Sequence, residues 1–305
     1  MKKKIIAIIV AIVLIIPVSR GWYVFLLDNF FDAELASSTQ LKFRKISDTE
    51  VEVVGYDSYL HGSITIPEKI RIGLDLYKVT SIGSYAFDGC SSLTSIKIPE
   101  GVTSIGYSTF SGCNSLEPKL LVYDKGTKCY GWIGNKEKCT DVVIPEGVTS
   151  IGGSAFYRCS SLTSINIPEG VTSIGGGAFY YCESLTSINI PEGVTSIGGS
   201  AFYRCSSLTS INIPEGVTSI GGGAFYYCES LTSINIPESV TSIGKCAFEG
   251  CRSLTSIKIP KSVTSIGEDA FWGCNNLEIV IDNSEKKVKV GWNAFENCKS
   301  VKWLK

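Results

Sequence analysis

Histidine is almost absent from the sequence. The 305 residues include one, His61, and the single methionine is the first residue. A Ser-His-acid triad, a His-rich metal cage or a His-driven pH switch would each depend on that one side chain. Net charge is nearly absent too, because 28 basic residues face 29 acidic ones, which argues against a nucleic-acid binder that neutralises phosphates. We therefore expect no enzymatic activity, no cofactor and no nucleic-acid partner.

One long apolar run stands at the amino terminus. Residues 2–4 are lysines and residues 5–18 are apolar, which is the order of an export signal. Extended to residues 5–27, the segment is long enough to cross a bilayer. We predict residues 1–35 to be an uncleaved signal anchor, with a cleaved signal peptide as the alternative. Either would place the rest of the chain outside the cell, held at the membrane or secreted.

A unit of 23 residues recurs along the chain. The segment IPEGVTSIG and its variants place their prolines at Pro145, Pro168, Pro191, Pro214, Pro237 and Pro260. Ala-Phe, two residues and a cysteine follow with the same spacing, so the unit is CxSLTSIxIPxxVTSIGxxAFxx. About seven large apolar side chains cannot offset the backbone entropy of one ordered unit. Stacked units cover one another's open faces, so we predict a solenoid.

Each part of the unit predicts one part of a coil. The alternation of Ile165, Asn166 and Ile167 favours a short strand with inward isoleucines, and the following proline ends it. VTSIG supplies a second extended segment and a glycine turn. Phe179 and Cys182 are three residues apart, so one helical turn would place both on an inward face.

The pattern LxxIxIPxxVxxIGxxAFxxC, over about residues 79–302, resembles the BspA-like leucine-rich repeat family of the Treponema pallidum type. The resemblance implies a right-handed, mainly β repeat solenoid, with a parallel β-sheet on one face and short turns or helical pieces on the other. It also implies a surface location, since members of that family are commonly surface proteins and some are adhesins.

Three segments depart from the regular pattern. Residues 36–78 contain strand-like and turn-like stretches and are predicted to form an amino-terminal β cap. The solenoid then spans residues 79–305, and its last part, from about residue 283 to 305, is predicted to be a carboxy-terminal cap. Cys113 and Cys159 are 46 residues apart, which is two unit lengths, but residues 114–144 lack the consensus of the unit between them, so we expect an irregular repeat there.

The irregular repeat carries two pairs of candidate residues. Cys129 and Cys139 could form an extracellular disulfide that closes a local loop. The alternative is two unpaired cysteines, with Cys139 pointing inward as in the regular repeats. Tyr130 and Trp132 are a candidate exposed binding patch, and the alternative is a pair of aromatic side chains that cover an irregular core.

Parallel strands would align the polar positions of successive units on one face. The serines and asparagines that recur there are Ser164, Asn166, Ser187, Asn189, Ser210, Asn212, Ser233 and Asn235. Such a face could form hydrogen bonds with an extended protein or a glycan. The alternatives are a merely soluble face and, for the threonines beside these residues, ice binding.

Two further rows are expected from the same spacing. On the opposite side lie Tyr157, Tyr180, Tyr203 and Tyr226, beside Arg158 and Arg204 that alternate with Tyr181 and Tyr227. Structural packing, sugar stacking and protein contact are the alternatives for this row. The repeat cysteines include no CxxC pair and no neighbouring histidine, so we expect buried free thiols and no metal site.

One block of two units is copied whole, because residues 144–192 are identical to residues 190–238. Such a copy indicates that repeat number can change without loss of function, which is easy for an extended surface and hard for a catalytic pocket. We predict a monomeric, non-enzymatic protein of the adhesion type whose extended surface binds a protein or a glycan. The alternative is a structural spacer without a ligand of its own.

Overall fold

The computed structural model describes residues 40–56 and 60–304. The predicted signal segment, residues 1–35 with the span at residues 5–27, lies outside the described residues. Within the described ranges, no helix combines the length and the apolar character needed to cross a bilayer.

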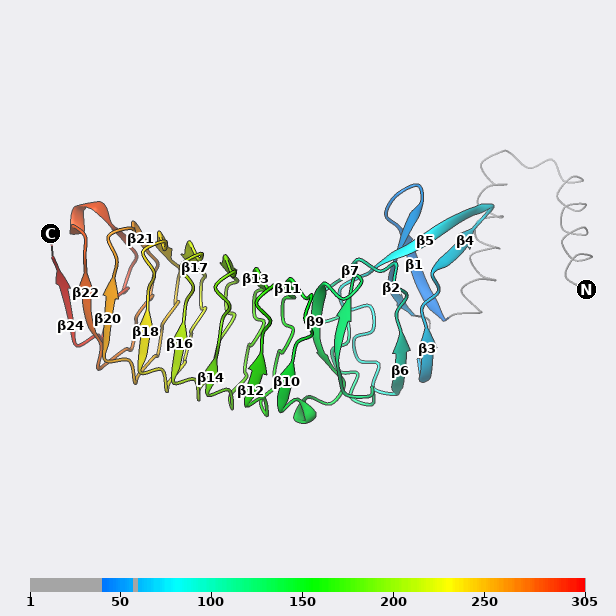
Figure 1. The fold of residues 1–305 in the computed structure, drawn as a ribbon, viewed down its shortest axis with the longest axis horizontal. Coiled ribbons are helices and arrows are strands. Elements are labelled where there is room, and N and C mark those ends of the chain that lie inside the picture. The colour runs from blue at the N-terminus through cyan, green and yellow to red at the C-terminus, as the bar shows by residue number, and fades with distance from the viewer. Residues whose placement is uncertain (1–39, 57–59, 305) are drawn as a thin grey trace, which may run out of the picture.

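The chain forms a long stack of coils, and most coils contribute one short strand to each of two faces (Figure 1). The first face, called the strand face, is built from the SIN segments and their equivalents. Its strands are β6 (Leu93–Lys97), β10 (Asp141–Val143), β12 (Ser164–Asn166), β14 (Ser187–Ile188), β16 (Ser210–Asn212), β18 (Ser233–Asn235), β20 (Ser256–Ile259), β22 (Glu278–Ile281) and β24 (Ser300–Trp303). Neighbours pair in parallel within the sheets β10–β12, β14–β16–β18 and β20–β22–β24, and Ile211 lies opposite Ile234 one unit later. The predicted parallel sheet is confirmed.

The second face is also built from strands. Each VTSIG segment supplies a pair of residues, in β7 (Ser104–Ile105), β11 (Ser150–Ile151), β13 (Ser173–Ile174), β15 (Ser196–Ile197), β17 (Ser219–Ile220), β19 (Ser242–Ile243) and β21 (Ser265–Ile266), followed by β23 (Lys289–Val290). These strands pair in parallel, as Ser173 does with Ser196. A coil therefore has two short strands joined by turns.

The single helical turn predicted around Phe179 and Cys182 is not formed. Residues 177–182 form tight turns instead, in which Cys182 N–H donates to Phe179 O at 3.1 Å. Alternate amides point to the next coil, as Phe179 N–H does to Ala201 O at 2.8 Å. Gly177 and Tyr181 have left-handed backbones, with φ of 62° and 60°, which a right-handed helix excludes. Hydrogen bonds between coils thus replace those within a helix.

The core repeats the same positions in every regular coil. Buried phenylalanine rings stack from Phe156 to Phe271, with centroids 5.1–5.5 Å apart. From Cys182 to Cys298, the repeat cysteine donates a hydrogen bond to the phenylalanine carbonyl of the preceding coil, as Cys205 Sγ does to Phe179 O at 3.2 Å. All 12 cysteines are free thiols, and burial raises the pKa of Cys228 to about 12. Cysteine therefore serves as a small core residue with a hydrogen-bond donor.

The amino-terminal strands extend the same two ladders. They are β1 (Leu41–Lys45), β2 (Glu50–Tyr56), β3 (Gly62–Thr65), β4 (Lys69–Ile72) and β5 (Asp75–Ile82). Strand β3 runs parallel to β6, and β5 runs parallel to both β2 and β7. The coil arrangement thus reaches back to residue 62, inside the segment predicted as a cap. Strand β1 pairs antiparallel with β2 and covers the open edge.

The carboxy-terminal segment continues both faces. Strand β23 pairs with β21, and β24 pairs with β22, each in parallel. A short 3-10 helix, η2 (Glu285–Lys287), links the two faces. Residues 283–304, predicted as a cap, therefore form a further coil of the stack.

The irregular repeat interrupts both ladders. It forms an antiparallel hairpin of β8 (Lys119–Tyr123) and β9 (Lys128–Ile133), followed by the 3-10 helix η1 (Lys136–Lys138). Strand β9 then runs parallel to β11 and so starts the second face of the following coils. The buried core is divided at this point into two clusters, one of them reaching from Leu41 to Leu116 and including Ile133, the other extending from Cys129 to Ala294.

Candidate binding surface

All eight predicted serine and asparagine residues have exposed side chains on the strand face. The isoleucine between each serine and asparagine points inward, and Ile211 is 6% exposed. Ser210 lies opposite Ser233, and Asn212 opposite Asn235. Because neighbouring strands are about 4.8 Å apart, hydroxyl and amide groups form two parallel rows at that spacing.

The asparagine side chains are available to a ligand. Three of the threonines that begin these segments are bonded within the protein: Thr163 Oγ1 donates to Thr140 O at 3.2 Å, Thr209 Oγ1 to Thr186 O at 3.1 Å and Thr232 Oγ1 to Thr209 O at 3.1 Å. The four strand-face asparagines, in contrast, make no side-chain hydrogen bond within the described part of the chain. Ser164 at the start of the row is already engaged, because its Oγ donates to Asp141 Oδ1 at 2.6 Å.

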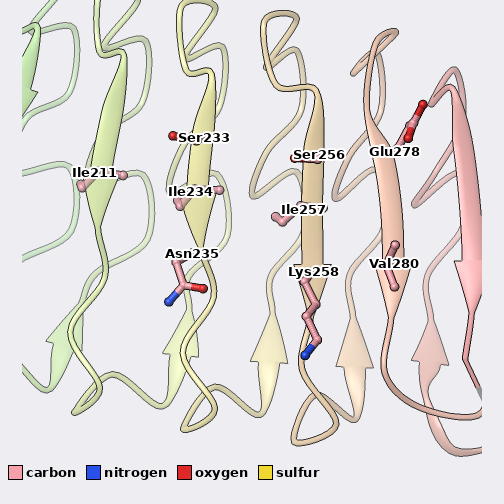
Figure 2. Close-up of a pocket in the computed structure, with 9 residues that line it drawn as sticks. All are labelled: Ile211, Ser233, Ile234, Asn235, Ser256, Ile257, Lys258, Glu278 and Val280. Atoms are coloured by element: carbon pink, nitrogen blue, oxygen red, sulfur yellow. The ribbon is translucent and has the colours of Figure 1, made fainter.

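The row ends in a shallow groove of about 620 Å³ that crosses β16, β18, β20 and β22. Figure 2 shows Asn235 and Lys258 extending from neighbouring strands, with Glu278 and Val280 on the next. Ser233 of the predicted set lines the groove with Asn235. The six earlier predicted residues lie outside it.

Three groove residues break the repeat. Lys258 takes the position of Asn235 one unit later, while Glu278 and Val280 lie opposite Ser256 and Lys258. The ammonium of Lys299 lies 2.7 Å from Glu278 Oε1 and lowers the pKa of that carboxyl. Glu278 and Val280 were not predicted from the sequence, because neither residue recurs in the repeat. Their departure from the repeat was the signal that could have found them.

Tyr130 and Trp132 are not the exposed patch that was predicted. Both are half-buried and lie on β9. Tyr130 packs edge-on against Phe110, with centroids 5.4 Å apart, and Phe110 N–H donates to its hydroxyl at 3.3 Å. Trp132 packs against the other core cluster. The β8–β9 register shifts at Tyr130, which has no residue opposite it, and Gly131 has a φ of 118°. This irregularity breaks the alternation of β9 and turns the two rings to different clusters, so they cover an irregular core.

Cys129 and Cys139 are free and fully buried, and no disulfide joins them in the structure. Cys129 lies on β9 opposite Ile151, whereas Cys139 follows η1, where the neighbouring Cys159 thiol raises its pKa. The hairpin thus directs the two thiols to different neighbours. Among the described residues, no group of three or more His, Cys, Asp or Glu side chains converges as a metal site.

The tyrosine row on the turn side is packed against itself. Tyr203 stacks on Tyr180 at 4.2 Å and on Tyr226 at 4.4 Å. Beside it, Arg204 lies between the rings of Tyr181 and Tyr227, at 5.5 and 5.2 Å. The ring faces needed for sugar stacking are covered, which favours structural packing for these side chains.

Several solved structures of leucine-rich repeat proteins are similar to this chain. A leucine-rich repeat protein from Eubacterium ventriosum is 19% identical, with a TM-score of 0.59 over 85% of this chain and 93% of its own. A leucine-rich cell surface protein from Faecalibacterium prausnitzii is 24% identical over 87% and 93% of the two chains, with a TM-score of 0.37. The leucine-rich repeat protein of T. pallidum is 23% identical over 85% and 86%, with a TM-score of 0.38. Among these, the Eubacterium protein shows a shared fold.

Sequence comparison gives the family. A search of curated proteins gives no match. The family model described as the BspA type leucine-rich repeat region matches six copies, over residues 62–121, 133–252 and 218–305. The first match begins at the residue where the parallel ladder of the strand face begins. The chain therefore belongs to the BspA-type leucine-rich repeat family.

Proposed function

We propose that the protein is a non-enzymatic, adhesion-type surface protein whose strand face binds an extended protein or glycan outside the cell. The observation that carries this proposal is the row of exposed serines and unbonded asparagines that ends in the groove at Lys258. An extended ligand laid across the strands would meet a fresh amide at every coil, so many weak contacts would add up. The protein acts as a monomer in this proposal.

The proposed location rests on the amino-terminal sequence. Residues 2–4 and the apolar run after them favour export, with residues 5–27 as an anchor in the membrane or residues 1–35 as a cleaved signal. The mass of the mature protein distinguishes the two. Both leave the repeats outside the cell.

The strand face is tested by charge. The double variant Asn212→Arg and Asn235→Arg places two bulky cations on exposed positions without touching the core, so the melting temperature should stay within a few degrees. Binding of the full chain to an array of immobilised matrix proteins and glycans should become at least tenfold weaker. The matched control is Thr218→Arg with Thr241→Arg, which carries the same charge on the second face. Unchanged binding of the strand-face variant would overturn the proposal.

The spacer is the second candidate, and the copied block of 46 residues, 144–189 repeated as 190–235, is the observation that favours it. Deleting residues 145–190 removes two coils and shortens the solenoid by about 10 Å. If the protein is a spacer without a ligand of its own, the deletion should shorten the solenoid and change nothing else. A binding surface should lose affinity for the ligand identified on the array, because fewer asparagine side chains of the strand face remain in contact with it.

A further inference from the structure

A second groove lies on the turn side of the solenoid, where the irregular repeat meets the first copied coils. Its volume is about 710 Å³, within the usual range of about 300–1,000 Å³ for small-ligand sites. One wall comes from the 3-10 helix η1 and the other from the turns of two coils, while Asn114 of the preceding coil closes one side. It shares no residue with the strand-face groove.

The wall from the irregular repeat is fixed in place. Trp132 Nε1 donates to Asn135 O at 3.1 Å, and Asn135 Oδ1 accepts from Glu137 N–H at 2.9 Å. The ammonium of Lys136 donates to Trp132 O, and Cys139 anchors the end of the turn in the core. The indole of Trp132 thus positions the residues that line the groove.

The wall from the coils is fixed by ring contacts. The guanidinium of Arg158 lies 5.4 Å from the ring centroid of Tyr157 and 5.7 Å from that of Tyr181. Tyr181 also contacts Arg204, at 5.5 Å, and the ring of Tyr180, at 4.9 Å between centroids. These contacts limit the rotamers of Arg158 and Tyr181. The two side chains therefore lose little conformational entropy when a ligand binds in the groove.

The lining has a distinct chemistry. Two cations, Lys136 and Arg158, are balanced by two anions, Glu137 and Glu183, and amide and hydroxyl groups supply the rest. The single aromatic ring, that of Tyr181, is flanked by arginines. A balanced set of donors and acceptors, with more polar than apolar surface exposed, disfavours a lipid, an apolar peptide, a polyanion or a polycation. It matches a ligand with many neutral hydroxyl groups.

We propose that this groove binds a short neutral oligosaccharide, held by Lys136, Arg158 and Glu183 through hydrogen bonds to its hydroxyl groups. The site is separate from the strand face and does not depend on that proposal. The copied coils supply an internal control, because Arg204, Tyr227 and Glu229 repeat one wall of the groove 46 residues later. The irregular wall is missing there, so those residues should not bind the sugar.

The test is an array of neutral, sialylated and sulfated oligosaccharides probed with the full chain. We expect binding to a neutral oligosaccharide, which isothermal titration then measures for the variants. Glu183→Gln and Lys136→Gln should each weaken it about tenfold, since each removes a charge-assisted hydrogen bond. Glu229→Gln, the matched control, should stay within about twofold. Glu183 and Glu229 are both exposed, so the variants should fold alike.

Several results would overturn the proposal. These are no binding to any neutral sugar, a preference for sulfated or sialylated sugars, and equal losses for Glu183→Gln and Glu229→Gln. The strand-face double variant separates the two sites, since it should leave this sugar bound with unchanged affinity. Trp132→Phe keeps the ring but removes the bond to Asn135, so a loss without a lower melting temperature would confirm a positioning role.

Discussion

The irregular repeat, residues 114–144, and the copied coils, residues 144–238, are neighbours in one solenoid but are held together differently. In the copied coils each core residue packs against the same residue type of the next coil, as Phe179 stacks on Phe202 with ring centroids 5.3 Å apart. In the irregular repeat unlike groups meet, because β8 pairs antiparallel with β9 and Tyr130 packs edge-on against the amino-terminal core. Repetition yields a regular surface, whereas the departure yields residues found at one place only, which a selective site requires.

The largest expected effect on this comparison comes from Gly131, where the irregular repeat docks on the copied coils. Its φ is +118°, and an added Cβ would lie 1.9 Å from Ala155 O. We expect Gly131→Ala to lower the free energy of unfolding by about 3 kcal/mol or more, because it combines backbone strain with a clash. Urea unfolding followed by circular dichroism measures this.

Gly126 provides the control in the turn of the same hairpin. Its φ is +86°, yet an added Cβ has nothing within 4 Å. Gly126→Ala should therefore cost only about 1 kcal/mol, from backbone strain alone. Equal losses for the two variants would contradict the view that close approach to Ala155 fixes the docking.

A smaller effect should separate the cysteines of the two regions. Cys205 in a copied coil donates to Phe179 O at 3.2 Å, whereas Cys129 Sγ donates no hydrogen bond within the described residues. Cys205→Ala should cost about 2 kcal/mol and Cys129→Ala about 1 kcal/mol, since only the first loses a hydrogen bond with its volume. A larger loss for Cys129→Ala without reductant would instead indicate a disulfide, which contributes about 2–4 kcal/mol.

The smallest effect concerns the pH dependence at the strand-face groove. Lys299 holds the pKa of Glu278 below its ordinary value, so the pair stabilises the fold above the unfolded pKa of about 4.3. This contribution is lost as pH falls through the lowered folded pKa. Lys299→Gln should raise the pKa of Glu278 in an NMR titration. Lys258→Gln, the control, should leave the pKa of Glu278 unchanged. A raised pKa of Glu278 in the Lys258→Gln variant would show that Lys299 is not the main partner of this carboxyl.

Much of the regular coil could be predicted because it depends on local alternation. The inward position of Ile165 and the outward position of Asn166 follow from period two along a strand. The turn after Gly177 could not be predicted in the same way. Phe179 N–H bonds to Ala201 O in the next coil, and that partner exists only once the coils are stacked.

The candidate sites divide in the same manner. The exposed row of serines and asparagines was predicted from spacing, since each unit repeats it. The groove at Lys258 and Glu278 was not, because its lining comes from residues that differ between neighbouring strands. Tyr130 and Trp132 were predicted as a patch from their nearness in sequence, but the register shift at Tyr130 turns them to different core clusters.

The sequence by itself determined the period, the family, the inward apolar set and the outward polar row, because a periodic pattern specifies the face on which each residue lies. Only the tertiary structure decided that Cys139 meets Cys159, that β9 starts the second face of the following coils, and that η1 forms a groove with Arg158. Each of these contacts joins residues that do not repeat. Their partners are set by how the hairpin docks, and no local pattern encodes that docking.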